Sequence, residues 1–396
     1  MLYVPISTAH FTRSNTQWRY FMEANIQWSR VICRQDGNYL GWPTIASCSN
    51  GELLVVFSGD REEHACPYGK THMIRSSDQG LSWSKPEIIN NSPLDDRDAG
   101  LSVLESGTMI VSWFTAPWGA AIKGASEQKL YPEKQIDAWT RHYQKVSKSD
   151  AQSCLGNWTR RSTDGGQTWG TPVNSIASTP HGPKQLADGR MLYVGIDDVY
   201  SAEPKLISVE SVDEGKSWKQ IGTMPIPEFH QAIQYCEPNA VQSTDGKIIC
   251  LWRHQPDETA DSIIFGPADE NRFMWQTESS DGGHTWTLTH PTKLLGYPPH
   301  LLRLSGGEIL ATYGRRLTPM GIRACLSLGN GDYWDVENEF ILRDDAPELD
   351  LGWPPGWDLG YPATIELDTG EFMTVYYQIE PPDHKPSIKA TRWSVH

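Results

Sequence analysis

Side chains that can move protons or bind anions stand next to short apolar segments along this 396-residue chain. His64 carries an imidazole, which titrates near neutral pH, and Arg253 carries a guanidinium, which can bind a carboxylate through two hydrogen bonds. Glu237 lies sixteen residues before Arg253, and Tyr361 precedes another apolar segment. One such residue alone is usually a satisfied polar group, but several that converge on one axis predict a binding or catalytic pocket.

The elements that must position these residues are visible as two interleaved repeats. The pattern S-x-D-x-G-x-[ST]-W occurs four times, and a decayed copy, SLGNGDYW, starts at Ser327. Each copy predicts a hairpin turn in which Ser and Asp bond to the turn's own amides and Trp packs between neighbouring sheets. We expect the four aspartates to be structural and to lie on one face: Asp78, Asp164, Asp213 and Asp281.

The second repeat consists of apolar runs that turn back at a glycine. These glycines are Gly51, Gly107, Gly189, Gly246, Gly307 and Gly370, at intervals of 56, 82, 57, 61 and 63 residues. Short strands at this spacing predict an all-β propeller of four-stranded blades. We expect one domain over residues 1–396 with six blades, or seven if the N-terminal 35 residues and the last strand form another. The longest interval holds an insertion around residues 116–150, which favours helix.

The glycine turns also predict which residues line the mouth of the central channel. The residue nine before each glycine should lie at that mouth: Trp42, Asp98, Pro180, Glu237, Pro298 and Tyr361. Flanking residues and the ends of the returning strands add Arg97, His181, His300, His64, Arg253, Arg316 and Tyr377. We expect Trp42, Arg97, His181, His300, Arg316 and Tyr377 to bind substrate. The run Asp95-Asp96-Arg97-Asp98 fits either a sugar contact or an ion cluster that braces a loop.

Charge and composition exclude several classes of partner. The net charge of −15 disfavours nucleic acid, which needs a basic face. No apolar run reaches the roughly 18 residues of a membrane span, and the first residues lack a secretory signal. We therefore expect a cytoplasmic protein, or a secreted one if a leader has been removed. Seven cysteines without a CxxC motif predict reduced thiols. No cofactor and no catalytic metal are expected, although a structural metal ion would be compatible with the sequence.

These repeats and the ring of polar residues resemble the sialidase superfamily of Asp-box, or BNR-repeat, propellers, over nearly the whole chain. In that family three arginines hold the substrate carboxylate, a glutamate activates a tyrosine nucleophile, and an aspartate is the acid/base. The resemblance implies that Glu237 and Arg253 match the glutamate and the second arginine. It implies that Tyr361 matches the nucleophile and that Arg323 matches the third arginine.

Two positions depart from that pattern. Gly41-Trp42-Pro43 replaces the family's Arg-Ile-Pro motif, and His64 stands near the expected aspartate. The set therefore resembles the propeller lyases that eliminate uronates, and the segments GDREEHACPYGK and LDDRDAGL are similar to lyases that cut the rhamnose–glucuronate linkage. Such a reaction needs a cation for the carboxylate, a base for the C5 proton and an acid for the leaving oxygen. We expect Arg253, Arg323 or Arg97 for the first, and His64 and Tyr361 for the other two.

The leading hypothesis is thus a lyase that acts on a terminal uronate of an acidic oligosaccharide or polysaccharide. A sialidase-like exo-glycoside hydrolase that uses Tyr361 and Glu237 is the first alternative. A glycan-binding propeller without activity is the second. The products separate the first two, because only elimination creates an unsaturated uronate.

Overall fold

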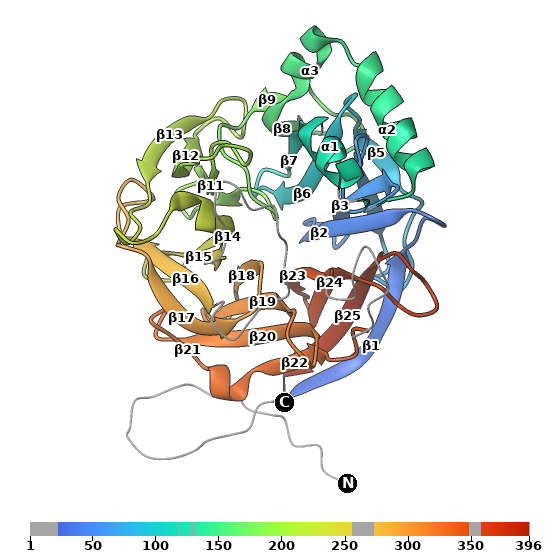
Figure 1. The fold of residues 1–396 in the computed structure, drawn as a ribbon. Helices are drawn as coiled ribbons and strands as arrows, with labels where there is room; N and C mark the ends of the chain where they lie inside the picture. The colour runs from blue at the N-terminus through green and yellow to red at the C-terminus, as the bar shows by residue number, and fades with distance from the viewer. Residues whose placement is uncertain are drawn as a thin grey trace, which may run out of the picture.

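The strands of the described residues form six sheets around a common axis (Figure 1). This computed structural model describes residues 23–117, 119–127, 129, 131–255, 273–347 and 358–395. The all-β, sialidase-like propeller predicted from the repeats is confirmed, with six blades among these residues. Within the same residues, no helix is both long and apolar enough to cross a membrane.

Each blade is an antiparallel sheet whose first strand lies nearest the axis (Figure 1). Blade 1 consists of β2 (Tyr39–Ser47), β3 (Leu53–Arg61), β4 (Lys70–Ser76) and β5 (Glu87–Asn90). Blade 2 consists of β6 (Asp95–Val103), β7 (Met109–Ala116), β8 (Gly156–Ser162) and β9 (Val173–Asn174). Blade 3 consists of β10 (Lys184–Gln185), β11 (Met191–Ile196), β12 (Leu206–Ser211) and β13 (Lys219–Thr223).

The second half of the ring repeats this order. Blade 4 consists of β14 (Tyr235–Gln242), β15 (Ile248–His254), β16 (Phe273–Ser279) and β17 (His290–Leu295). Blade 5 consists of β18 (Pro299–Arg303), β19 (Ile309–Arg315), β20 (Gly321–Leu328), β21 (Tyr333–Trp334) and β22 (Phe340–Arg343). Blade 6 consists of β23 (Gly360–Glu366), β24 (Phe372–Gln378), β25 (Ser387–Val395) and β1 (Ala24–Cys33).

The N-terminal strand closes the ring. β1 pairs antiparallel with β25, from Ala24 opposite Val395 to Cys33 opposite Ile388. The described part of the N-terminal segment therefore completes blade 6 and does not build the seventh blade considered as an alternative. Residues 1–22 lie outside the described residues.

The four repeated boxes fold as the sequence predicts. In the first, Ser82 N donates to Asp78 Oδ1 at 2.9 Å and Gly80 N donates to Ser76 Oγ at 2.8 Å. The other three boxes repeat these bonds. The box tryptophan can reach the neighbouring blade, as Trp218 Nε1 donates to Thr159 Oγ1 at 3.0 Å. These aspartates are structural because their oxygens are used by their own turns.

A bulge at the start of the inner strand re-aims one side chain in most blades. The pairing register shifts at this point in β2, β6, β14 and β23. Each shift holds one non-glycine residue in the left-handed region, with φ of 56° at Trp42, 53° at Asp98, 49° at Glu237 and 48° at Tyr361. These four residues are among the six that the glycine offset places at the channel mouth.

The predicted insertion is a group of three helices between β7 and β8, at the rim of blade 2 (Figure 1). They are α1 (Gly119–Glu127), α2 (Glu133–Lys145) and α3 (Lys148–Cys154). Ile136 and Trp139 of α2 are buried against α1 and the segment that joins the two helices. Trp139 Nε1 also donates to Glu62 Oε2 at 2.8 Å, which ties the insertion to the loop that follows β3.

Candidate active site

Tyr361, Glu237 and Arg253 meet at the channel mouth from two blades. Arg253 Nη1 donates to Glu237 Oε2 at 2.7 Å and lies 3.4 Å from the Tyr361 hydroxyl oxygen. The Tyr361 hydroxyl in turn donates to Glu237 Oε1. Burial, followed by the Glu237 carboxylate, raises the pKa of Tyr361 well above its usual range. The phenol therefore keeps its proton, and Glu237 is the group that can receive it.

His64 and Asp358 form a second pair beside Trp42. His64 Nδ1 lies 2.9 Å from Asp358 Oδ2, and the hydroxyls of Tyr39 and Tyr377 donate to the same carboxylate at 2.9 and 2.7 Å. Burial would raise the pKa of Asp358, but His64, Arg316 and the Tyr377 hydroxyl hold it at about 2. An ionised carboxylate thus fixes the orientation of the imidazole.

Arg97 determines which nitrogen of His64 carries the proton. Arg97 Nη2 lies 3.4 Å from His64 Nε2, and a guanidinium can only donate. His64 Nε2 must therefore accept, so that the proton of the neutral ring sits on Nδ1 and faces Asp358. Burial outweighs the influence of Asp358 and lowers the pKa of His64. The ring is neutral at neutral pH and presents a basic nitrogen beside a cation.

Trp42 packs at the centre of this cluster. Only 1% of its surface is exposed, and its ring lies 4.4 Å from the Arg97 guanidinium carbon and 4.8 Å from that of Arg61. The rings of His64 and Tyr361 are T-shaped to the same ring, at centroid distances of 5.3 and 6.2 Å. Trp42 was expected to bind substrate; in this arrangement it is a buried support for the arginines.

The structure brings Arg316 to the cluster and keeps Arg323 away from it. Arg316 lies 3.4 Å from the Tyr377 hydroxyl, and its guanidinium carbon lies 5.9 Å from the Tyr361 ring. Arg323 is on β20, the third strand of blade 5, where it contacts Glu339 at 3.5 Å and donates to the Arg343 carbonyl. The third arginine of the cluster is thus Arg316, because Arg323 lies in the body of its blade.

His181 and His300 form a separate group in the channel, with Lys184. The two rings meet edge to face at 5.1 Å, and Lys184 Nζ lies 3.4 Å from His300 Nε2. Burial lowers the pKa of His181 to about 3 and that of His300 well below its usual range. Both histidines are therefore neutral, and they contact each other and Lys184 in a group of their own.

Two acidic residues of the site had no assigned function in the sequence analysis. Asp98 lay among the expected mouth positions, but its charged neighbours gave an equally good structural explanation. Asp358 stands two residues before the inner strand of blade 6 and is 294 residues from His64. No short motif links those two positions. Within the described residues, no group of three or more His, Cys, Asp or Glu side chains is placed to hold a metal ion.

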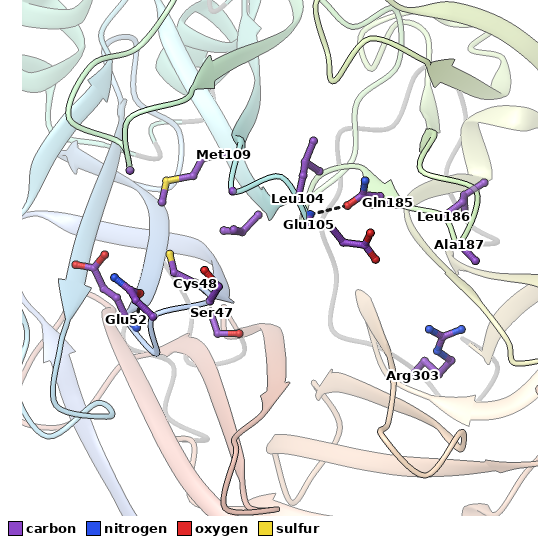
Figure 2. Close-up of a pocket in the computed structure, with 15 residues that line it drawn as sticks. Ser47, Cys48, Glu52, Leu104, Glu105, Met109, Gln185, Leu186, Ala187 and Arg303 are labelled. Carbon is purple, nitrogen blue, oxygen red and sulfur yellow. Dashed lines mark hydrogen bonds between the residues drawn. The ribbon is translucent and has the colours of Figure 1, made fainter.

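A pocket of about 500 Å³ lies at the opposite end of the channel (Figure 2). Its walls come from the glycine turns of the inner strands and include Glu52, Glu105, Gln185 and Arg303. Gln185 Oε1 accepts from Glu105 N at 2.9 Å, which joins two of these turns. The candidate active site is at the other mouth, where the inner strands begin.

Comparisons with known proteins agree with this architecture. A model of the BNR repeat-like domain matches residues 137–374. No curated protein matches the chain. A structure of unknown function from Dyadobacter fermentans is 22% identical, with a TM-score of 0.71 and coverage of 94% of this chain and 99% of that one.

Two enzymes share the fold at lower identity. NanB sialidase from Streptococcus pneumoniae is 13% identical, with a TM-score of 0.60 and coverage of 92% and 70% of the two chains. An α-L-arabinanase from Penicillium chrysogenum is 13% identical, with a TM-score of 0.56 and coverage of 93% and 98%. At identities this low, the structural likeness shows a common fold and no more. The chemistry must be argued from the site.

Proposed function

The chain belongs to the BNR repeat-like domain family, and we propose that it is a carbohydrate-active enzyme that cleaves a terminal acidic sugar at the channel mouth. The preferred reaction is β-elimination at a uronate. The proposal is supported chiefly by one distance, the 3.4 Å between Arg97 Nη2 and His64 Nε2. At this distance the Arg97 guanidinium, which can bind a carboxylate, lies next to the His64 imidazole, which can act as a base.

Elimination requires this proximity because C5 of a uronate is bonded to the carboxyl carbon. Arg97 binds the carboxylate, which makes the C5 proton more acidic and stabilises the enolate that develops. His64 Nε2 then exchanges its contact with Arg97 for the C5 proton. Asp358 stabilises the imidazolium through Nδ1, at 2.9 Å. Arg316 adds a second cation near the same mouth.

Retaining hydrolysis is the second candidate, and a different observation favours it. The Tyr361 hydroxyl already donates to Glu237, which is braced by Arg253 at 2.7 Å. Transfer of the phenolic proton to Glu237 would create a nucleophile for the anomeric carbon. This pairing matches the order of residues expected from the sialidase resemblance.

The two reactions are distinguished by their products. Incubation of oligosaccharides in which a glucuronate carries a sugar at O4, in ¹⁸O-water, with ultraviolet absorbance and mass spectrometry, is the decisive experiment. Elimination gives an unsaturated uronate that absorbs and carries no ¹⁸O, and this is the expected result. Hydrolysis adds one ¹⁸O and no absorbance. Binding without turnover on uronate and sialate glycans would contradict both and favour a glycan-binding propeller.

Variants of the two candidate residues give an independent test. His64→Ala should lower kcat by at least about 10²-fold, because a placed base contributes roughly 10²–10⁴ in rate. Asp358 keeps its bonds from Tyr39 and Tyr377, so the melting temperature should change little. Tyr361→Phe should abolish turnover only if the reaction is hydrolysis. A His64→Ala enzyme that retains full elimination activity would show that the imidazole is structural.

A further inference from the structure

Elimination also needs a proton for the leaving oxygen at C4. The sequence pointed to Tyr361 for this step. The hydroxyl hydrogen of Tyr361 is, however, directed at Glu237 Oε1. Glu237 also binds Arg253, so it is an acceptor on both oxygens. A phenol held in this way is poorly placed to give its proton to a sugar oxygen.

We propose that Asp98, in its protonated form, is the acid that donates this proton. The inference rests on the proposed elimination reaction and names a catalytic residue for it. Asp98 occupies the bulge at the start of β6, with a φ of 53°. The bulges that hold Glu237 and Tyr361 are its equivalents in blades 4 and 6, so all three side chains are directed by the same backbone geometry.

The surroundings of Asp98 favour a neutral carboxyl group. Only 6% of the residue is exposed, and its Oδ1 is buried without a hydrogen-bond partner among the described residues. A buried, charged carboxylate with an unbonded oxygen is costly, and protonation lowers that cost. Burial is the main cause that raises the pKa of Asp98, to about 7, and Glu237 raises it further while Arg97 lowers it.

Binding of the substrate strengthens this tendency. The carboxylate of a uronate would neutralise Arg97, which is the main charge that lowers the pKa of Asp98. Asp98 therefore stays protonated in the complex, when its proton is needed. The other charged or titratable groups whose electrostatic influence reaches Asp98 are Arg61, Asp95, Tyr193, Tyr200, Glu237 and Tyr361.

The proton balance of the reaction is then complete. The C5–H bond breaks, its proton moves to His64 Nε2, and its electron pair forms the C4–C5 double bond. The C4–O bond breaks, and the leaving oxygen takes the proton of Asp98. The products are an unsaturated uronate and a free alcohol. Solvent afterwards takes a proton from His64 and returns one to Asp98.

The test compares two leaving groups in the full-length enzyme. One substrate is a uronate with a sugar at O4, and the other has 4-nitrophenoxide, an anion that leaves without protonation. Asp98→Asn keeps the shape of the side chain, and Asn tolerates the left-handed backbone. We expect it to lower kcat for the sugar substrate by at least about 10²-fold. For the nitrophenoxide substrate the loss should be less than about fivefold.

Controls separate this inference from the proposed function. His64→Ala should lose activity on both substrates, since both need the base. If the unmodified enzyme eliminated neither substrate, the proposed function itself would be refuted. Equal losses on both substrates in a folded Asp98→Asn enzyme, or no loss at all, would overturn the assignment of Asp98 while leaving elimination intact.

The pH dependence gives a second readout. An acid must be protonated to act, so kcat/KM for the sugar substrate should fall as the pH rises through about 7, the pKa of Asp98 without substrate, and kcat should fall only at higher pH. This alkaline decline should disappear with the nitrophenoxide substrate. An alkaline decline of the same size with both substrates would contradict the role of Asp98.

Discussion

Arg61 and Arg97 both lie against Trp42 and both have Asp95 as an ionic partner, but Asp95 holds Arg61 more closely. Arg61 donates to both oxygens of Asp95 and to the His64 carbonyl, and its side chain is fully buried. Arg97 Nη1 is 3.9 Å from Asp95 and Arg97 Nη2 faces His64. Arg61 is thus held by charge-assisted bonds to both oxygens of Asp95, whereas Arg97 Nη2 lies beside the imidazole that the proposed reaction uses.

Arg316 and Arg323 offer a matched test of the carboxylate grip. Arg316→Ala should weaken the binding of an acidic sugar by about 10-fold or more, since a charge-assisted bond is worth about 1.5–3 kcal/mol. Arg323→Ala should instead lower the melting temperature, because Glu339 and three backbone carbonyls lose their donor. Calorimetric titration and thermal unfolding measure the two effects. Weaker binding in Arg323→Ala at unchanged stability would restore that residue to the site.

The positions of site residues were easier to predict than their partners. The glycine offset is a local rule, and it named Trp42, Asp98, Glu237 and Tyr361 because each precedes its turn by the same number of residues. The His64–Asp358 bond spans 294 residues and follows no local rule. The exchange of Arg323 for Arg316 has a similar cause. Arg316 comes just before the turn between β19 and β20, and Arg323 comes just after it. Only the fold decides which of the two side chains reaches the axis.

Strands and turns were predictable because they repeat, whereas the bulges were not. Alternating apolar residues define a strand, but a bulge inserts a residue without any composition signal at these positions. A left-handed, non-glycine residue costs roughly 1–3 kcal/mol, and such strain gathers where a side chain must be aimed. Blade 3 illustrates the limit. There His181, with a φ of 70°, holds the left-handed position, one residue after the expected Pro180.

The helical insertion bears on the site through one carboxylate. Glu62 Oε2 accepts from Trp139 Nε1 at 2.8 Å and from Gln135 Nε2 at 3.2 Å, both on α2. Its other oxygen accepts from the Tyr68 hydroxyl. Because Glu62 is two residues before His64, the insertion restrains the loop that carries the imidazole. Helix α2 therefore supports the loop of the candidate active site.

Trp139→Phe should weaken this support without removing the packing of the ring. We expect kcat to fall several-fold with little change in KM, because His64 is less well oriented while the arginines are untouched. Trp158→Phe is the matched control, since its indole donates to the Cys154 carbonyl at 2.8 Å, away from Glu62. Both variants should lose similar stability. Equal kcat values in the two, measured under saturating substrate, would contradict a positioning role for α2.

The charge of the whole molecule opposes the charge of its candidate substrate. A net charge of −15 repels an acidic sugar at long range, and salt screens such repulsion within about 10 Å. Attraction must therefore come at short range from Arg97, Arg253 and Arg316, which are all buried at one mouth. The propeller brings them together because every inner strand begins at that mouth. The ring of blades thus brings residues that are far apart in the sequence into one cluster.

That ring is closed by the pairing of the two ends of the described chain. Ala24 and Val395 are direct partners on β1 and β25 (Figure 1). A two-residue turn could join them into a hairpin. The turn at Gly37 joins blades 6 and 1, and a Cβ added at Gly37 would meet no other atom within 4 Å. It is therefore a suitable place for the new N- and C-termini of a circularly permuted chain. A permuted chain that starts at Gly37 and ends at Asp36 would contain every strand of the ring.

We expect this permuted chain to fold with unchanged activity, because the new connection lies at the outer edge of blade 6, far along the sheet from the inner strand β23. The control is the same chain ended at Val395, which lacks β1 and also lacks residues 1–22. It leaves β25 with an unpaired edge, a site for aggregation, and should melt at least about 5 °C lower. Thermal unfolding and light scattering compare the two proteins. If the shorter chain were equally stable and monomeric, β1 would be dispensable, and closure of the ring would have to come from packing between blades alone.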